Sequence, residues 1–94
     1  MSWSDRAEAD LDEIWRFTEE RWGEDQADLY LCRLKQAVAD ATVRKRRARA
    51  INFVRPGLFK MREVRHFIYF RIAEGEIVVV RVLHDSMDEI LHLP

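Results

Sequence analysis

The chain has 94 residues, 48% of them hydrophobic and three of them tryptophan, which predicts one folded domain over residues 1–94 rather than a disordered chain. No apolar run reaches the roughly 18 residues that a membrane span needs, and the N-terminus lacks the apolar segment of a secretory signal. The single cysteine, Cys32, excludes an internal disulfide, so we expect a protein of the reducing cytoplasm with no membrane association.

The net charge of −1 conceals a segregation of charge along the chain. Residues 1–32 carry 10 acidic and 3 basic side chains, whereas residues 33–71 carry 12 basic and 2 acidic ones. Residues 72–94 are acidic again, with 5 acidic side chains and 1 basic one. This separation predicts a basic surface, which would attract nucleic acid or an acidic protein segment.

The first predicted helix covers residues 7–22. Its apolar side chains recur at helical spacings, which is typical of one buried face: Ala7, Leu11, Ile14, Trp15 and Trp22. We expect Trp15 to be buried between the helices and a sheet. Gly23 follows directly and suits a helix C-terminus in left-handed geometry.

A second predicted helix follows, with Asp25 as its expected N-cap. Its apolar residues also share one face: Ala27, Tyr30, Leu31, Leu34, Val38 and Ala41. The short break between the two helices predicts an antiparallel helical hairpin. The basic stretch RKRRAR at residues 44–49 comes next, and we expect the second helix to run on into it.

The second half of the chain predicts strands, because it is rich in β-branched and aromatic residues. A turn at residues 55–57 (RPG) precedes a strand over residues 59–65. Strands over residues 66–72 and 77–84 form a hairpin whose turn contains Gly75. Alternation in the last strand predicts one face with Val78, Val80, Val82 and His84. The predicted fold is α+β, a helical hairpin packed on a small twisted antiparallel sheet.

The sequence contains no Gly-rich phosphate loop, no HExxH motif and no CxxC motif. The three histidines have no cysteine or acid at a familiar ligand spacing, so we expect no metal site and no cofactor. Cleavage of RNA without a metal uses cationic and imidazole groups around a phosphate. The chain supplies these residue types in its second half: Arg62, Arg65, Arg71, Arg81 and His84.

The sequence resembles the ParE toxins of the RelE/ParE toxin–antitoxin superfamily from about Asp5 to Leu93. Three motifs carry the resemblance: ADLDEIW at residues 9–15, the WG..QA..Y...L pattern at residues 22–34, and VRVLH..MD...HL at residues 80–93. The family fold implied is a helical hairpin on a twisted antiparallel sheet. The resemblance adds a short first strand, which residues 2–5 (SWSD) supply.

The resemblance also implies a function, that of the toxin of a type II toxin–antitoxin system. Such a toxin inhibits DNA gyrase, is not an enzyme, and is neutralised by a ParD-like antitoxin in a hetero-oligomer, of which a heterotetramer is one form. It reaches DNA only through that antitoxin.

Two alternatives remain open. One is a RelE-type, ribosome-dependent mRNA endoribonuclease, although the chain has no tyrosine near its C-terminus. The other is an inactive toxin that serves only as an antitoxin-binding module. The sequence departs from the family pattern in its shortened first strand, in the RKRRAR stretch that replaces a Pro- and Gly-containing turn, and in Ser86, where an arginine is usual.

We expect the binding surface for the antitoxin or the target on a basic, partly aromatic face of the sheet. Acidic groups of the antitoxin would meet Arg71 and Arg81, unless Arg81 pairs with an acid of the chain such as Glu74. The tail would pack back on the domain through Met87, Leu91 and Leu93. The expected binding residues are Arg62, Arg65, Tyr69, Arg71, Arg81, His84 and Met87.

Overall fold

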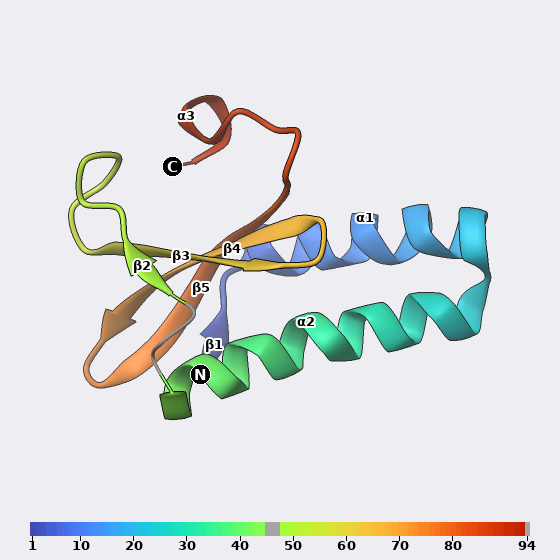
Figure 1. The fold of residues 1–94 in the computed structure, drawn as a ribbon, viewed down its shortest axis with the longest axis horizontal. Helices are drawn as coiled ribbons and strands as arrows, with labels where there is room; N and C mark the ends of the chain where they lie inside the picture. The colour runs from blue at the N-terminus through green and yellow to red at the C-terminus, as the bar shows by residue number, and fades with distance from the viewer. Residues whose placement is uncertain (45–47, 94) are drawn as a thin grey trace.

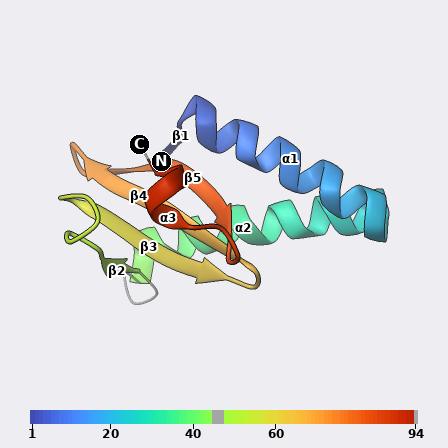
Figure 2. The same cartoon turned by 90° about the horizontal axis from the view of Figure 1, so that it is seen from above.

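The computed structural model describes residues 1–44 and 48–93, which form a helical hairpin on one face of a five-stranded sheet (Figure 1). The elements in chain order are β1 (Ser2–Trp3), α1 (Asp5–Trp22), α2 (Glu24–Arg44), β2 (Arg49–Ala50), β3 (Leu58–Glu63), β4 (His66–Ala73), β5 (Glu76–His84) and α3 (Glu89–His92). The strand order is β1-β5-β4-β3-β2. Helices α1 and α2 cover one face, while α3 and the loop before β3 lie on the other (Figures 1 and 2). The predicted α+β class is confirmed.

The sheet is mixed, because β1 pairs in parallel with β5, whereas the other strand pairs are antiparallel as predicted. The short first strand predicted at residues 2–5 is confirmed at Ser2–Trp3. Ser4 then connects the sheet to α1. Its hydroxyl accepts a hydrogen bond from the Ala7 amide at 3.1 Å and donates one to the Val80 carbonyl at 2.9 Å. Ser4 therefore caps α1 and fixes the start of this helix against β5.

The two long helices meet at a single glycine. Gly23 has a φ of 91°, and its amide donates to the Glu19 carbonyl at 2.9 Å, which ends α1 as predicted. Helix α2 begins at the next residue, and the Gly23 carbonyl accepts the amide of Ala27 at 3.1 Å. The prediction of Asp25 as N-cap is therefore wrong, because Asp25 already lies in the first helical turn.

The apolar faces predicted for the helices are confirmed, except at the tryptophans. The residues of α1 and α2 that form the core with the sheet are Ala7, Leu11, Ile14, Leu34, Ala37, Val38 and Ala41. Trp15 is only half-buried, and its indole donates to the Asp28 carboxylate at 2.9 Å. The expectation that Trp15 is buried between the helices and the sheet is wrong for the sheet, because the face toward the sheet repeats through Ile14 and Thr18, which turns Trp15 toward α2. Trp22 is exposed.

The prediction of one continuous face in β5 is wrong beyond Val80, because the strand contains a β-bulge. Tyr69 pairs with Arg81, but its neighbour Phe70 pairs with Val79, so Val80 is an extra residue. The bulge shifts the alternation: Val79 and Val82 both belong to the helix-side core.

The β3–β4 and β4–β5 hairpins have two-residue turns. The predicted turn at Gly75 is confirmed, with Glu74 and Gly75 at φ 53° and 78° between β4 and β5. The strand predicted over residues 59–65 ends at Glu63 instead, because Val64 and Arg65 form a turn into β4. Val64 has a φ of 53°, which a strand cannot contain.

A second, smaller core lies on the face opposite the helices, beneath the tail and the loop before β3. Its buried members are Ile51, Leu58, Tyr69, Leu83 and Leu93. The expected packing of the tail is therefore confirmed for Leu93, but it is wrong for Met87 and Leu91, which are exposed. Helix α2 extends to Arg44, and residues 45–47 of the basic stretch lie outside the described residues. No helix in the described part of the chain has the length and apolar character to cross a membrane.

Candidate functional site

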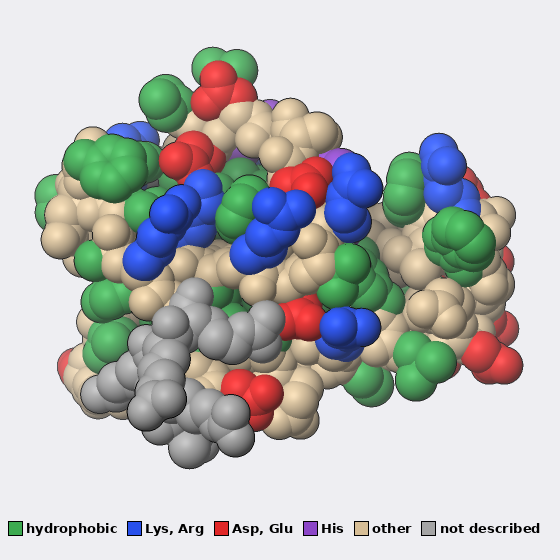
Figure 3. All heavy atoms as spheres, viewed as in Figure 1, with side chains coloured by type: hydrophobic (Ala, Val, Ile, Leu, Met, Phe, Trp, Pro, Cys, Tyr) green, Lys and Arg blue, Asp and Glu red, His purple; other side chains and the backbone are tan. Residues whose placement is uncertain are grey.

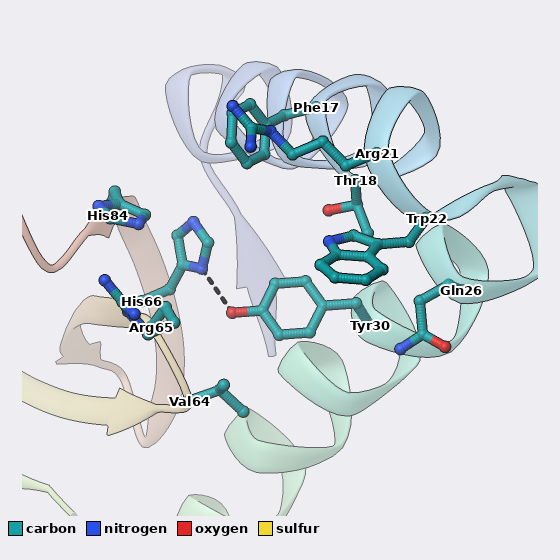
Figure 4. Close-up of a pocket in the computed structure, with 10 residues that line it drawn as sticks. All are labelled: Phe17, Thr18, Arg21, Trp22, Gln26, Tyr30, Val64, Arg65, His66 and His84. Carbon is teal, nitrogen blue, oxygen red and sulfur yellow. Dashed lines mark hydrogen bonds between the residues drawn. The ribbon is translucent and has the colours of Figure 1, made fainter.

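A groove separates the helical hairpin from the β3–β4 turn and the end of β5 (Figure 4). Its volume is about 760 Å³. We call it the helix–sheet groove, and its lining residues are Phe17, Thr18, Arg21, Trp22, Gln26, Tyr30, Val64, Arg65, His66 and His84. An adjoining hollow shares Phe17, His66 and His84 and continues to Met87. The groove walls are mainly apolar and aromatic, with a few polar groups between them.

Tyr30, His66 and His84 form the polar centre of this groove. The Tyr30 hydroxyl is hydrogen-bonded to Nδ1 of His66, and the rings of His66 and His84 meet edge to face at a centroid distance of 5.3 Å (Figure 4). Burial, followed by the nearby charge of His84, lowers the pKa of His66 to about 4. His66 is therefore neutral at pH 7. Burial also favours the neutral form of Tyr30, which raises the pKa of its hydroxyl.

Asp85 gathers two arginines at the sheet side of the groove. Its Oδ2 accepts hydrogen bonds from Arg62 at 2.8 Å and from Arg65 at 3.1 Å. Asp85 thus holds two guanidinium groups together at the end of β5, next to His84. Figure 3 shows lysine and arginine side chains in a band over β2 and β3, interleaved with acidic ones. The basic middle of the chain thus pairs in part with acids from the segments that flank it.

Arg81 is buried, so the expectation that it lies on an open face is wrong. It is 8% exposed and holds Asp10 of α1 through two hydrogen bonds of 2.8 and 2.9 Å. Its third contact is the His92 carbonyl at 2.7 Å. The Asp10 carboxylate, which also accepts the Val82 amide, raises the pKa of Arg81. The pairing acid is therefore Asp10 rather than Glu74, and the pair connects α1, β5 and the tail.

Tyr69 is also internal, with 1% of its surface exposed. Its hydroxyl donates to Oε2 of Glu89 at 2.7 Å, and Lys60 donates to the same oxygen at 2.7 Å. Burial, followed by this hydrogen bond, raises the pKa of Tyr69, and the bond from Lys60 lowers the pKa of Glu89. The expectation of open aromatic surface around Tyr69 is wrong, because α3 covers it and Glu89 of α3 is hydrogen-bonded to its hydroxyl.

The structure thus divides the seven expected binding residues. Arg65, His84 and Met87 line the groove or its extension, and Arg62 flanks it through Asp85. Arg71 is exposed on the other face of the sheet, near the loop at residues 55–58, and Arg81 and Tyr69 hold the tail.

Sequence reasoning missed most of the groove: Phe17, Trp22, Tyr30, Val64 and His66. Trp22 and Tyr30 did appear in the predicted apolar stripes, which are wider than the sheet can cover. That excess of aromatic residues was a signal that part of the helical hairpin remains open.

The arrangement suits binding better than catalysis. The arginines that metal-free RNA cleavage would require do not lie together. Arg71 lies on the sheet face opposite the helices, and Arg81 is buried in an ion pair with Asp10. Within residues 1–44 and 48–93, no cluster of three His, Cys, Asp or Glu side chains is placed to hold a metal ion. An open apolar groove with a basic flank is the type of surface that receives an amphipathic chain segment.

The fold and the groove define a small α+β domain with an open apolar binding surface, and comparisons with known proteins specify its family. A family model described as the ParE toxin of the type II toxin–antitoxin system parDE matches residues 1–89. Toxin ParE1 of Mycobacterium tuberculosis is 45% identical over 86 residues, which cover 90% of this chain and 88% of that protein. Toxin ParE1 of Caulobacter vibrioides is 32% identical over 90 residues, which cover 96% of this chain and 93% of the relative.

The fold also matches a solved structure, titled as the chromosomal ParDE TA system from P. aeruginosa. The TM-score is 0.73, with 20% sequence identity over 88% of this chain and 91% of that one. The chain therefore belongs to the ParE family, the toxins of type II toxin–antitoxin systems. The resemblance seen in the sequence is confirmed.

Proposed function

We propose that this toxin inhibits DNA gyrase by binding to it, without catalysing a reaction, and that a ParD-type antitoxin neutralises the toxin in the cytoplasm. The observation that carries the proposal is the match to the ParE family over residues 1–89, together with 45% identity to a relative named Toxin ParE1. ParE toxins as a class are expected to poison gyrase. The ParDE title of the matching structure supports an antitoxin of the ParD type.

The side chains that could perform chemistry support a non-enzymatic toxin. Neutral His66 is engaged by Tyr30, and Nδ1 of His84 is engaged by the Ser86 hydroxyl at 2.7 Å. Arg62 and Arg65 share Asp85, which competes with any phosphate for their guanidinium groups. A ribonuclease of the RelE type would have to break these pairs before binding its substrate.

We further propose that the helix–sheet groove receives the C-terminal segment of the antitoxin. Apolar side chains of that segment would cover Trp22 and Phe17, which are 72% and 53% exposed. Carboxylates of the segment would contact Arg65, which lines the groove, and Arg62, which shares Asp85 with it. His84 and Met87 would form the far end of the same surface.

The test of toxicity is a supercoiling assay with purified gyrase, relaxed plasmid DNA and ATP. The toxin should stop supercoiling in proportion to its concentration, and prior mixing with the antitoxin encoded beside it should restore activity. Translating ribosomes incubated with the same toxin should yield no cut messenger RNA. Site-specific cleavage of messenger RNA with unaffected gyrase would reject the proposal in favour of a ribonuclease. Normal growth of cells that accumulate folded toxin without antitoxin would leave only a binding module.

A further inference from the structure

The β3–β4 and β4–β5 turns have the same φ at their first residue but very different side chains there. Val64 in the β3–β4 turn and Glu74 in the β4–β5 turn both have a φ of 53°. Positive φ is natural for Gly, Asn and Asp, and it is a genuine outlier for a β-branched residue such as valine. Holding valine in this conformation lowers the stability of the folded state.

Packing inside the protein does not compensate for this strain at Val64. The Val64 side chain is 44% exposed. The Val64 carbonyl accepts a hydrogen bond from Arg62 at 3.0 Å, which a backbone carbonyl of any residue at this position could do. A glycine or asparagine would permit the same turn with less strain. The valine side chain therefore has a use that the isolated domain does not reveal.

The position of Val64 indicates that use. It lies on the sheet side of the helix–sheet groove, across from the aromatic side chains of the helical hairpin (Figure 4). Trp22 and Phe17 on the helical side are also exposed, so apolar surface faces the groove from both walls. Glu74 offers a contrast, because its turn is exposed and lines no part of this groove or its extension.

The positive charge of Arg65, which lies beside Val64, indicates which kind of segment would occupy the groove. Arg65 follows Val64 in the turn and lines the groove, and its side chain is 66% exposed while it donates to Asp85 at 3.1 Å. An apolar side chain with a carboxylate close beside it would satisfy Val64 and Arg65 together. The groove extends from the helical hairpin to Met87, which suits a continuous amphipathic segment better than a single side chain.

We propose that Val64 is a strained anchor that determines antitoxin affinity, packing with Trp22 around an apolar residue of the antitoxin segment while Arg65 holds a neighbouring carboxylate. This inference rests on the proposed neutralisation by a ParD-type antitoxin. On this proposal the positive φ of Val64 lowers the stability of the free toxin, and the exposed valine side chain strengthens the contact with the antitoxin.

The test compares Val64→Asn with the matched control Glu74→Asn, since both place asparagine at the same φ. The midpoint of thermal unfolding of the free toxin should rise by several degrees for Val64→Asn, because strain is relieved without loss of a buried contact. Titration with the antitoxin encoded beside the toxin should show affinity weakened about tenfold or more for Val64→Asn. The Glu74→Asn protein should bind within about twofold of the wild type.

Each other outcome has a definite meaning. A Val64→Asn toxin that binds the antitoxin as tightly as the wild type overturns the anchor. A Val64→Asn toxin that keeps its antitoxin affinity but loses gyrase inhibition assigns this rim to the target and overturns the proposed occupant. Wild-type toxin that does not bind the antitoxin at all rejects the proposed function itself, and that result is distinct from the failure of a single variant.

Discussion

The two faces of the sheet are closed in different ways. On the tail side, polar groups are buried in pairs: Arg81 with Asp10, and Tyr69 and Lys60 with Glu89. On the groove side, Trp22 and Val64 leave apolar surface open to water. A buried polar group is costly without a partner, so the tail side is completed within the monomer. Covering exposed apolar surface with another molecule is favourable, so the proposed antitoxin segment would cover the groove side in a complex.

The largest effect should come from the buried pair on the tail side. Arg81→Ala leaves the Asp10 charge buried without its partner, so the free energy of unfolding should fall by about 3–5 kcal/mol. Urea denaturation followed by circular dichroism measures the loss. Arg71→Ala is the control, because Arg71 is exposed, and it should change stability by no more than about 0.5 kcal/mol.

A double variant, Arg81→Met with Asp10→Leu, separates the cost of an orphaned charge from the value of the pair. Since neither charge remains, it should be more stable than Arg81→Ala alone. Equal stability of the Arg81→Ala and Arg71→Ala proteins would show that the tail side is not held by this pair.

The groove side should respond in binding rather than in folding. Trp22→Ala should weaken antitoxin binding by about 2–4 kcal/mol, as expected for an aromatic anchor at the centre of an interface. Its effect on the unfolding of the free toxin should stay near 0.5 kcal/mol, because the side chain is already exposed. Leu29→Ala is the matched control, since Leu29 is exposed on the same hairpin but does not line the groove. Calorimetric titration that gives equal losses for both variants would contradict the assignment.

A smaller effect should appear with pH, at the centre of the groove. The pKa of His66 is about 4 in the folded state and near 6.5 when the chain is unfolded. Between these values the unfolded state binds more protons, so stability should fall as the pH drops from 6.5 toward 4. The groups that face His66 are Tyr30 and His84 with the charges of Asp85, Arg65 and Asp10, and burial dominates their combined effect.

After allowance for screening by solvent, the free energy of unfolding at pH 5 should be about 1–2 kcal/mol lower than at pH 7. His66→Gln removes the titrating group, so its stability should vary less over the same range than that of the wild type. Parallel curves for the two proteins would show that another group is responsible.

The smallest effect should come from the two hydrogen bonds that hold Glu89 of the tail, one from Tyr69 and one from Lys60. Tyr69→Phe removes one of the two donors to Glu89 and leaves Lys60 in place, so it should cost about 1 kcal/mol. The loss should appear as faster proteolysis after Glu89 with little change in antitoxin affinity. A large change in affinity would place the antitoxin on the tail side instead.

Much of the fold could be predicted because it follows from local patterns. The apolar spacing of Leu11 and Ile14 requires a helix with one buried face, and the positive φ available to Gly75 gives a hairpin turn. The β-bulge at Val80 could not be predicted, because strict alternation reads equally well without it. The parallel pairing of β1 likewise depends on where a two-residue strand finds an open edge, which no local pattern specifies.

The candidate site was harder to predict, for a physical reason. Residue type alone does not say whether an arginine that meets an acid is buried or exposed. Arg81 is buried with Asp10, 71 positions away in the sequence, whereas Arg65 pairs with Asp85 on the exposed rim of the groove. The groove itself combines Trp22, Tyr30 and His66 from three separate elements. Val64 could not be recognised at all, because its significance lies in a backbone angle.

Hydrogen exchange of the toxin, free and bound to its antitoxin, tests the contrast between the two faces most directly. The account predicts added protection of backbone amides around Trp22 and Tyr30 and in the turn at residues 64–66, with little change in the loop at residues 52–57 and in α3. Protection confined to that loop and α3, with the groove amides exchanging as in the free toxin, would contradict it.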